Sequence, residues 1–222
     1  TVTVEPKILF SEYLWVTGTS QGAKNYSKKF FSGAVKYLEN NNELVVEIAS
    51  NDGTFLKQFK ENGFNVLGVD PAKNIAKIAN KSGIKTIADF FSTKKAKEIQ
   101  SQYGKAGLVF ARNVIPHVPS AKDIVNGISI CLKRGGIGVI EFHRADIIFK
   151  ELHYDSIYHE HIFYYSIKSL TKLLSEFDLY PFDIITSPIS GGSFVIYFSP
   201  VFPYVSVLIR VLSLTCLLVM NQ

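Results

Sequence analysis

Short apolar runs alternate with amphipathic runs along most of this 222-residue chain, and this alternation limits the possible folds more than any other feature. The apolar runs have the length of buried strands, and each is followed by a run with helical spacing. Five predicted strands cover residues 44–50, 64–70, 84–90, 106–114 and 137–143. Strands and helices in this order predict an α/β fold with a parallel sheet and helices on both faces.

The end of the pattern differs from its beginning. Two predicted strands, 181–188 and 191–199, follow a helical run at 166–178 with no helix between them. Consecutive strands with a short connection pair as a hairpin. We therefore expect a Rossmann-like sheet that is mostly parallel, with one antiparallel edge strand.

Glycine and proline mark the expected helix boundaries. One helix is expected to begin with Pro71, because a missing N–H costs nothing in a first turn, and to stop at Gly83. The helix before it is expected to stop at Gly63. The helical run at 120–136 is expected to end at the glycine pair Gly135 and Gly136.

The pattern divides the chain into an entry segment (1–40), one domain (41–199) and an apolar tail (200–222). The tail is about as long as a bilayer-spanning helix. Arg210 lies near its centre, at a cost of roughly 2.5–3.5 kcal/mol on insertion scales, which disfavours a membrane anchor. The chain starts at Thr1 with no Met, so we expect a fragment or a processed product.

Charge and cysteine content narrow the function classes. The net charge is +5, but no aromatic-basic motif or recognition helix accompanies it, so a lysine-rich solvated surface is favoured over nucleic-acid binding. Cys131 and Cys216 both lie in apolar runs and are expected to be buried free thiols. That usage is typical of a reducing compartment and predicts a cytoplasmic protein. The oligomeric state stays open.

Ligands of open parallel sheets bind at the carboxyl ends of the strands, so the residues there are the candidates. The first strand ends in a turn with Glu47, Asn51 and Gly53 but without G-x-G-x-x-G, which favours a ligand lacking phosphates there, such as an amino-acid moiety. An ordinary β–α turn is the alternative. Asp70, before Pro71, could hold a ribose diol or cap the next helix.

Three further strand ends carry polar residues. Asp89 and Phe90 could bind an adenine, or the two phenylalanines there could belong to the core. The fourth strand is followed by Asn113 and His117. The fifth is followed by Glu141 and then by "YHEH" at 158–161.

In this order, "EIASNDGTFL", "GVDPAKNIA", "ADFF", "ARNVIPHV" and "YHEH" resemble class I S-adenosylmethionine-dependent methyltransferases. More narrowly they resemble the sugar C-methyltransferases, which methylate carbon 3 of nucleotide-linked 4-keto-deoxyhexoses. The segment "EYLWVTGTS" at 12–20 resembles that family's entry into its cofactor domain. The resemblance covers residues 10–199. The family's Cys-rich zinc module and its further α/β domain have no counterpart here, so the chain is expected to be truncated at both ends.

The resemblance implies S-adenosylmethionine as cofactor and a nucleotide-linked ketosugar as substrate. It implies cofactor contacts from Glu47, Asn51, Gly53, Asp70, Pro71, Asp89, Phe90 and Asn113, with Ala49 standing where many relatives have Gly. It implies substrate and acid–base roles for His117, Tyr158, Glu160 and His161.

Methyl transfer to a carbon beside a ketone requires a general base and a donor to the developing oxyanion. His161 or His117 suits the base, because free imidazole has a pKa near ~6.5. Tyr158 suits the donor, and Glu160 is expected to orient an imidazole. A metal is disfavoured because residues two apart, His159 and His161, share a side only on a strand. Two other function classes stay open: a cofactor-binding module without activity and, disfavoured by the missing glycines, a nicotinamide oxidoreductase.

Overall fold

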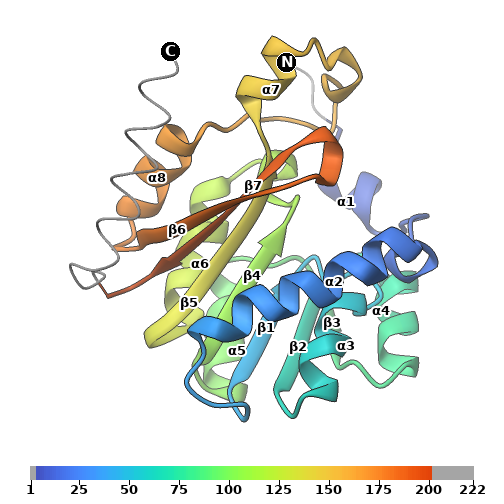
Figure 1. The fold of residues 1–222 in the computed structure, drawn as a ribbon. Helices are drawn as coiled ribbons and strands as arrows, with labels where there is room; N and C mark the ends of the chain where they lie inside the picture. Colours follow the sequence, from blue (N-terminus) through green and yellow to red (C-terminus); the bar gives the residue numbers. More distant parts are fainter. Residues whose placement is uncertain (1–3, 202–222) are drawn as a thin grey trace.

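The computed structural model describes residues 4–201, which form a seven-stranded sheet flanked by helices (Figure 1). The strand order is β3-β2-β1-β4-β5-β7-β6. The strands are β1 (Leu44–Ile48), β2 (Asn65–Asp70), β3 (Thr86–Ala88), β4 (Ala106–Arg112), β5 (Leu132–His143), β6 (Tyr180–Ser187) and β7 (Ser193–Ser199).

The sheet is parallel from β3 to β5 and antiparallel at one margin. β1 pairs in parallel with both β2 and β4, and β5 continues this arrangement beyond β4. β7 pairs antiparallel with β5 on one side and with β6 on the other. The expected fold class is confirmed, and so is the hairpin of the last two strands.

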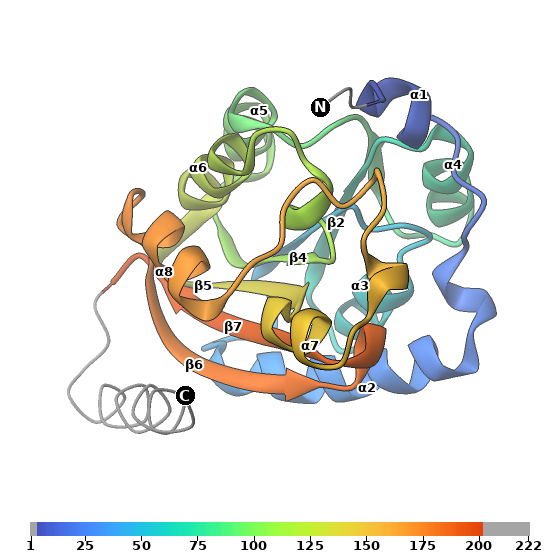
Figure 2. The same cartoon turned by 90° about the horizontal axis from the view of Figure 1, so that it is seen from above.

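Helices cover both faces of this sheet. The helices are α1 (Pro6–Phe10), α2 (Gln21–Ala34), α3 (Thr54–Glu61), α4 (Lys73–Lys81), α5 (Thr93–Tyr103), α6 (Ala121–Cys131), α7 (Ala145–Lys150) and α8 (Ile167–Ser175). Figure 2 shows α2 and α3 on one side of the sheet and α5, α6 and α8 on the other. Two buried apolar clusters, one on each face, hold these layers together.

Aromatic rings join α2 and α3 to the sheet. Phe30 of α2 lies 4.9 Å from the Phe110 ring of β4 and 5.7 Å from the Phe55 ring of α3, measured between centroids. Such side chains bury on the order of 150–250 Å² each, so they contribute strongly to helix docking. Helix α2, which makes up most of the helical structure in the expected entry segment (1–40), therefore packs on the sheet.

Two helix boundaries differ from the sequence-based expectation. The helix expected from Pro71 begins at Lys73, because Ala72 is extended and gives its N–H to the Asp70 carboxylate at 2.9 Å. The helix expected to reach the glycine pair ends at Cys131. Leu132 is buried and already belongs to β5, and Gly135, with φ of 76°, lies where the pairing of β4 with β5 shifts register. The glycines thus form a bulge within a strand.

Cys131 is buried as expected, and its burial raises the pKa of its thiol to about 12. Cys216 and the apolar tail beyond residue 201 lie outside the described residues. Within residues 4–201, no helix is both long and apolar enough to cross a bilayer.

Candidate active site

A cavity of about 800 Å³ opens where β1, β2, β4 and β5 end. The sequence placed its candidates at these strand ends, and most of them line this one space: Glu47, Ala49, Asn51, Asp70, Pro71, Phe90, Asn113, His117, Tyr158 and His161. Gly53, Asp89 and Glu160 are not among the lining residues. The topology therefore gathers residues that are up to 114 positions apart, from Glu47 to His161.

The turn from β1 to α3 has left-handed backbone at Ala49, Asn51 and Gly53, with φ of 54°, 50° and 79°. Two features of the turn require glycine at position 53. Its φ favours glycine, and an added Cβ would lie 2.7 Å from the Ile84 side chain. Gly53 thus shapes the turn rather than lining the cavity.

Asp70 ties the ends of β1 and β2 together. One carboxylate oxygen accepts the Asn51 N–H at 2.8 Å and the other accepts the Ala72 N–H at 2.9 Å. Burial raises the pKa of this carboxyl, and the two N–H groups oppose that shift. Each oxygen keeps a lone pair, so the side chain can still accept hydrogen bonds from two neighbouring hydroxyls. Asp70 both holds the turn that leads into α4 and faces the cavity.

Asp89 and Phe90 separate in the structure. The Asp89 carboxylate pairs with Lys95 at 2.8 Å, and this ammonium lowers the pKa of the Asp89 carboxyl. Phe90 and Phe91 both line the cavity, and Phe91 also belongs to the buried core. Both expectations for this aromatic pair therefore apply to Phe91, which borders the cavity and packs in the core.

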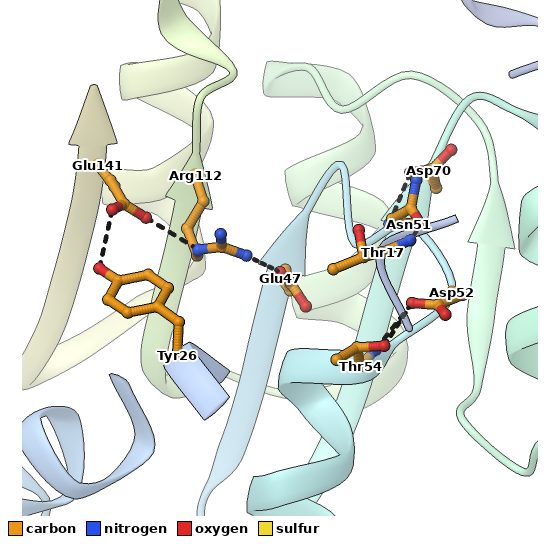
Figure 3. A network of polar contacts seen from close by, with 9 residues as sticks. All are labelled: Thr17, Tyr26, Glu47, Asn51, Asp52, Thr54, Asp70, Arg112 and Glu141. Atoms are coloured by element: carbon orange, nitrogen blue, oxygen red, sulfur yellow. Dashed lines mark hydrogen bonds and ion pairs between the residues drawn. The ribbon is translucent and has the colours of Figure 1, made fainter. Parts of the chain in front are cut away.

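A strap formed by residues 11–18 runs along the cavity and was not predicted as a site element. Asn74 holds it on one side: its amide accepts the Tyr13 N–H at 3.1 Å and donates to the Tyr13 carbonyl at 2.8 Å. Asn51 holds it on the other, accepting from the Thr17 N–H at 2.8 Å (Figure 3). The same amide donates to the Trp15 carbonyl at 3.0 Å. Asn51 thus contributes to the site by fixing the strap.

A buried charge network forms the wall between β1 and β5 (Figure 3). Arg112 Nε donates to Glu141 at 3.0 Å, and its Nη1 lies 4.0 Å from Glu47. Tyr26 of α2 donates its hydroxyl hydrogen to the other Glu141 oxygen at 2.8 Å. The Arg112 guanidinium also stacks 3.3 Å from the Phe55 ring centroid. The sequence offered one signal for this network, a Glu and an Arg within otherwise apolar strands.

The histidines of the two predicted motifs lie next to each other in the cavity lining, with their ring planes tilted by 54°. The rings of His117 and His161 lie 4.7 Å apart between centroids. His161 Nδ1 is 2.7 Å from the Ser156 carbonyl, so this nitrogen carries the proton and Nε2 has a free lone pair. The Tyr158 hydroxyl lies 3.3 Å from that Nε2. Burial, with a smaller effect from His161, lowers the pKa of His117 to about 4.

Main-chain carbonyls orient both imidazoles. His117 Nδ1 lies 3.1 Å from the Glu160 carbonyl, just as His161 faces the carbonyl of Ser156. The Glu160 carboxylate points instead toward His159, at 3.9 Å. We expected the Glu160 carboxylate to orient an imidazole, and this expectation is wrong. The main-chain carbonyl of Glu160 orients the His117 ring instead.

Two other cavity residues complete the geometry. Asn113 has a left-handed φ of 52°, and its N–H donates to the Glu141 carbonyl at 2.8 Å. His143, at the end of β5, is buried beside the cavity and its Nε2 has no hydrogen-bond partner. Burial lowers the pKa of His143, which keeps this ring neutral.

Comparison with solved structures gives the same fold. Magnesium protoporphyrin IX methyltransferase from Synechocystis PCC 6803, solved with bound SAH, aligns with a TM-score of 0.63 at 12% identity, over 80% of this chain and 83% of that one. N-methyltransferase NodS from Bradyrhizobium japonicum WM9 aligns with a TM-score of 0.58 at 12% identity, over 79% and 94%. At such identities the likeness shows the architecture alone.

Comparison of sequences is more specific. C-methyltransferase NovU from Streptomyces niveus is 33% identical over 198 residues, which is 89% of this chain and 47% of that protein. The chain thus spans about half the length of this curated relative. A family profile described as "Methyltransferase domain" matches residues 24–182. Since that match runs from α2 into the start of β6 and covers every cavity residue of the strand ends, the chain belongs to the methyltransferase domain family, whose cofactor is S-adenosylmethionine.

Proposed function

We propose that this chain is the catalytic part of a C-methyltransferase that methylates the carbon beside a ketone in a nucleotide-linked deoxyketosugar. The observation that carries the proposal is the Tyr158–His161 pair, which faces the same cavity as Asp70. The 33% identity to a protein named as a C-methyltransferase supports transfer to carbon. The resemblance of the sequence motifs to sugar C-methyltransferases supports the substrate class.

The cavity has side chains that suit S-adenosylmethionine. Asp70 offers free lone pairs for the hydroxyls of a ribose, and Phe90 offers an apolar ring for a base. Glu47 offers a buried carboxylate whose Oε2 has no partner, which suits a cationic ligand. When bound, the cofactor supplies an electrophilic methyl group on a sulfonium.

The chain's own residues can generate the carbon nucleophile. Tyr158 donates to His161 Nε2 in the structure, and the same hydroxyl can turn to donate to a ketone oxygen. That turn frees the Nε2 lone pair to take the proton from the neighbouring carbon. The C–H electron pair then becomes the enolate, whose negative oxygen Tyr158 stabilises. The enolate carbon accepts the methyl group. A positioned base contributes on the order of 10²–10⁴-fold to such a step.

His161 is the better candidate for the base than His117. With a pKa of about 4, His117 is neutral but weakly basic at neutral pH. Its ring packs on His161 and is fixed by the Glu160 carbonyl, so it suits a role in holding the His161 ring and the substrate.

The test is mass spectrometry of a reaction with labelled methyl donor and a panel of ketosugar nucleotides. We expect His161→Asn to abolish methylation while the dissociation constant for S-adenosylmethionine changes little. His159→Asn is the matched control in the same motif, because its side chain is 60% exposed. Binding of the donor without methylation of any ketosugar by the wild type would instead favour a cofactor-binding module.

Solvent exchange separates proton removal from methyl transfer. With S-adenosylhomocysteine bound, the wild type should exchange the sugar's α-proton for deuterium, and His161→Asn should not. Exchange at the wild-type rate in this variant would move the base to another residue, with His117 the next candidate.

A further inference from the structure

His143 is a buried imidazole in the cavity wall that proton removal and methyl transfer leave unused. It ends β5, its exposed fraction is 7%, and it lines the same space as Tyr158 and His161. Within residues 4–201, its Nε2 is buried without a hydrogen-bond partner, and its Nδ1 forms no hydrogen bond either. His117 and His161 differ, because a main-chain carbonyl fixes each of them through Nδ1. Buried polar atoms are rarely left without a partner in folded proteins, so this imidazole requires an explanation.

Two polar neighbours of His143 are engaged elsewhere. Ser193 is its cross-strand neighbour on β7, and the Ser193 hydroxyl donates to the Ile189 carbonyl at 2.9 Å. The His153 ring lies 5.9 Å away between centroids, and its Nε2 lies 3.2 Å from the Glu151 carboxylate. The space that His143 can still reach is the cavity that it lines.

The charge state of His143 limits what it can bind. Burial is the largest influence on its pKa and lowers it, and the rings of His153 and His161 lower it further, whereas Asp155 opposes them. The ring is therefore neutral, with one N–H donor and one lone pair. A hydroxyl group can accept from the first or donate to the second. A phosphate would favour the charged ring, which burial disfavours.

The place of β5 in the sheet puts His143 on the side of the cavity away from the proposed ribose site. β1 and β4 both lie between β2, which carries Asp70, and β5. His161, the proposed base, is near enough to influence the pKa of His143. A ligand group that reaches His143 is therefore expected to belong to the acceptor.

We propose that His143 is an acceptor-binding residue, which hydrogen-bonds a hydroxyl group of the sugar and so selects acceptors that carry it. The inference rests on the proposed function, because it names a group that the ketosugar must present. The ketone oxygen is assigned to Tyr158, so a different oxygen is required. In a nucleotide-linked 4-keto-6-deoxyhexose, ring carbons 2 and 3 carry the only free sugar hydroxyls. His143 thus distinguishes a sugar with the bonded hydroxyl from its deoxy analogue.

The ring can present either nitrogen to that hydroxyl. A half-turn about χ2 exchanges Nε2 with Cε1 and Nδ1 with Cδ2 within nearly the same volume. No hydrogen bond from residues 4–201 opposes this turn. The acceptor therefore fixes the tautomer and orientation of His143. In His161, by contrast, the Ser156 carbonyl already fixes the proton on Nδ1.

NMR of the imidazole nitrogens tests this without any turnover. Long-range proton–nitrogen spectra are recorded on protein labelled at its five histidines, with S-adenosylhomocysteine bound. The His143 signals are those missing from His143→Phe. The probes are a nucleotide-linked 4-keto-6-deoxyhexose and its 2-deoxy and 3-deoxy analogues. We expect the parent sugar to shift the His143 nitrogens toward one tautomer, and one of the two analogues to leave them unchanged.

Steady-state kinetics give a second readout. In the wild type, kcat/KM for the parent sugar should exceed that for the analogue without the bonded hydroxyl by roughly threefold to tenfold, as one neutral hydrogen bond allows. His143→Phe keeps a ring and removes both nitrogens, so it should use the two sugars equally well. His153→Phe is the matched control, because that ring neighbours His143 without lining the cavity. It should keep the wild-type preference.

Each failure has its own signature. If the His161 signals respond to the parent sugar and the His143 signals do not, the role of His143 is wrong and the proposed function stands. A full preference for the hydroxylated sugar in His143→Phe would also overturn this role. If neither histidine responds to any of the ketosugars, the proposed function is wrong, and the role of His143 falls with it.

Discussion

Ala49 has a left-handed φ of 54° in the turn that borders the cavity. A side chain in this conformation costs roughly 1–2 kcal/mol, whereas glycine adopts it freely. We expect Ala49→Gly to raise the free energy of unfolding by about 0.5–1 kcal/mol, after the added entropy of the unfolded glycine is subtracted. Urea unfolding measures this change. Ala23→Gly, in α2, should lower stability, so a loss in both variants would contradict the strain argument.

We propose that Asp70 holds the hydroxyls of the cofactor's ribose. We expect Asp70→Ala to weaken S-adenosylmethionine binding by about 1.5–3 kcal/mol, because charge-assisted hydrogen bonds are lost. Calorimetry measures the affinity, and circular dichroism checks that the variant folds. Asp146→Ala, whose carboxylate pairs with Arg144 and does not line the cavity, should bind normally. Unchanged affinity in Asp70→Ala would remove this residue from the site.

At the scale of elements, the strap of residues 11–18 depends on Asn74, which does not itself line the cavity. Asn74→Ala removes both bonds to Tyr13, each contributing about 0.5–1.5 kcal/mol. We expect faster hydrogen exchange at the Tyr13 amide and a several-fold weaker affinity for the cofactor. Asn62→Ala, at the end of α3, is the control and should change neither. Wild-type protection in Asn74→Ala would mean that other contacts hold the strap.

The sequence predicted the elements and strand ends well because these depend on local patterns. Asp70 and Asn113 could be predicted as site residues because each lies at the carboxyl end of a strand. That position can be read from the sequence without knowing their hydrogen-bond partners. The charge network was not predicted, because Tyr26 and Glu141 are 115 positions apart and nothing local specifies their pairing. The Asn51 amide was assigned to the cofactor because its backbone partners, Thr17 and Trp15, are more than 30 positions away and no local pattern specifies this pairing. The helix end at Cys131 was missed because Leu132 suits a helix as well as a strand.

At the scale of the whole molecule, His117 links stability to pH. Burial and the adjacent His161 lower the pKa of His117 to about 4. Below the usual imidazole pKa, this histidine is therefore protonated in the unfolded chain but still neutral in the folded protein. Stability from this residue is complete above about pH 6.5 and is lost progressively toward about pH 4. Between about pH 7 and pH 5 we expect a loss of roughly 2 kcal/mol.

Denaturant unfolding at both pH values, compared with His117→Gln, isolates this contribution. The variant should lose less stability on acidification than the wild type, because its side chain does not titrate. An equal loss in both proteins would assign the pH dependence to other groups, such as the buried carboxyls.

The interior position of β7 has a consequence for synthesis on the ribosome. β5 carries Glu141, and over Gly138–His143 one side of it is hydrogen-bonded to β7, where Glu141 faces Val195. Until residues 193–199 have emerged from the exit tunnel, β5 is an unprotected edge, and the network of Glu141, Arg112 and Tyr26 has no covering strand on that side. The nascent chain can therefore cover this side of β5, and with it the charge network, only after almost the whole described polypeptide has been translated.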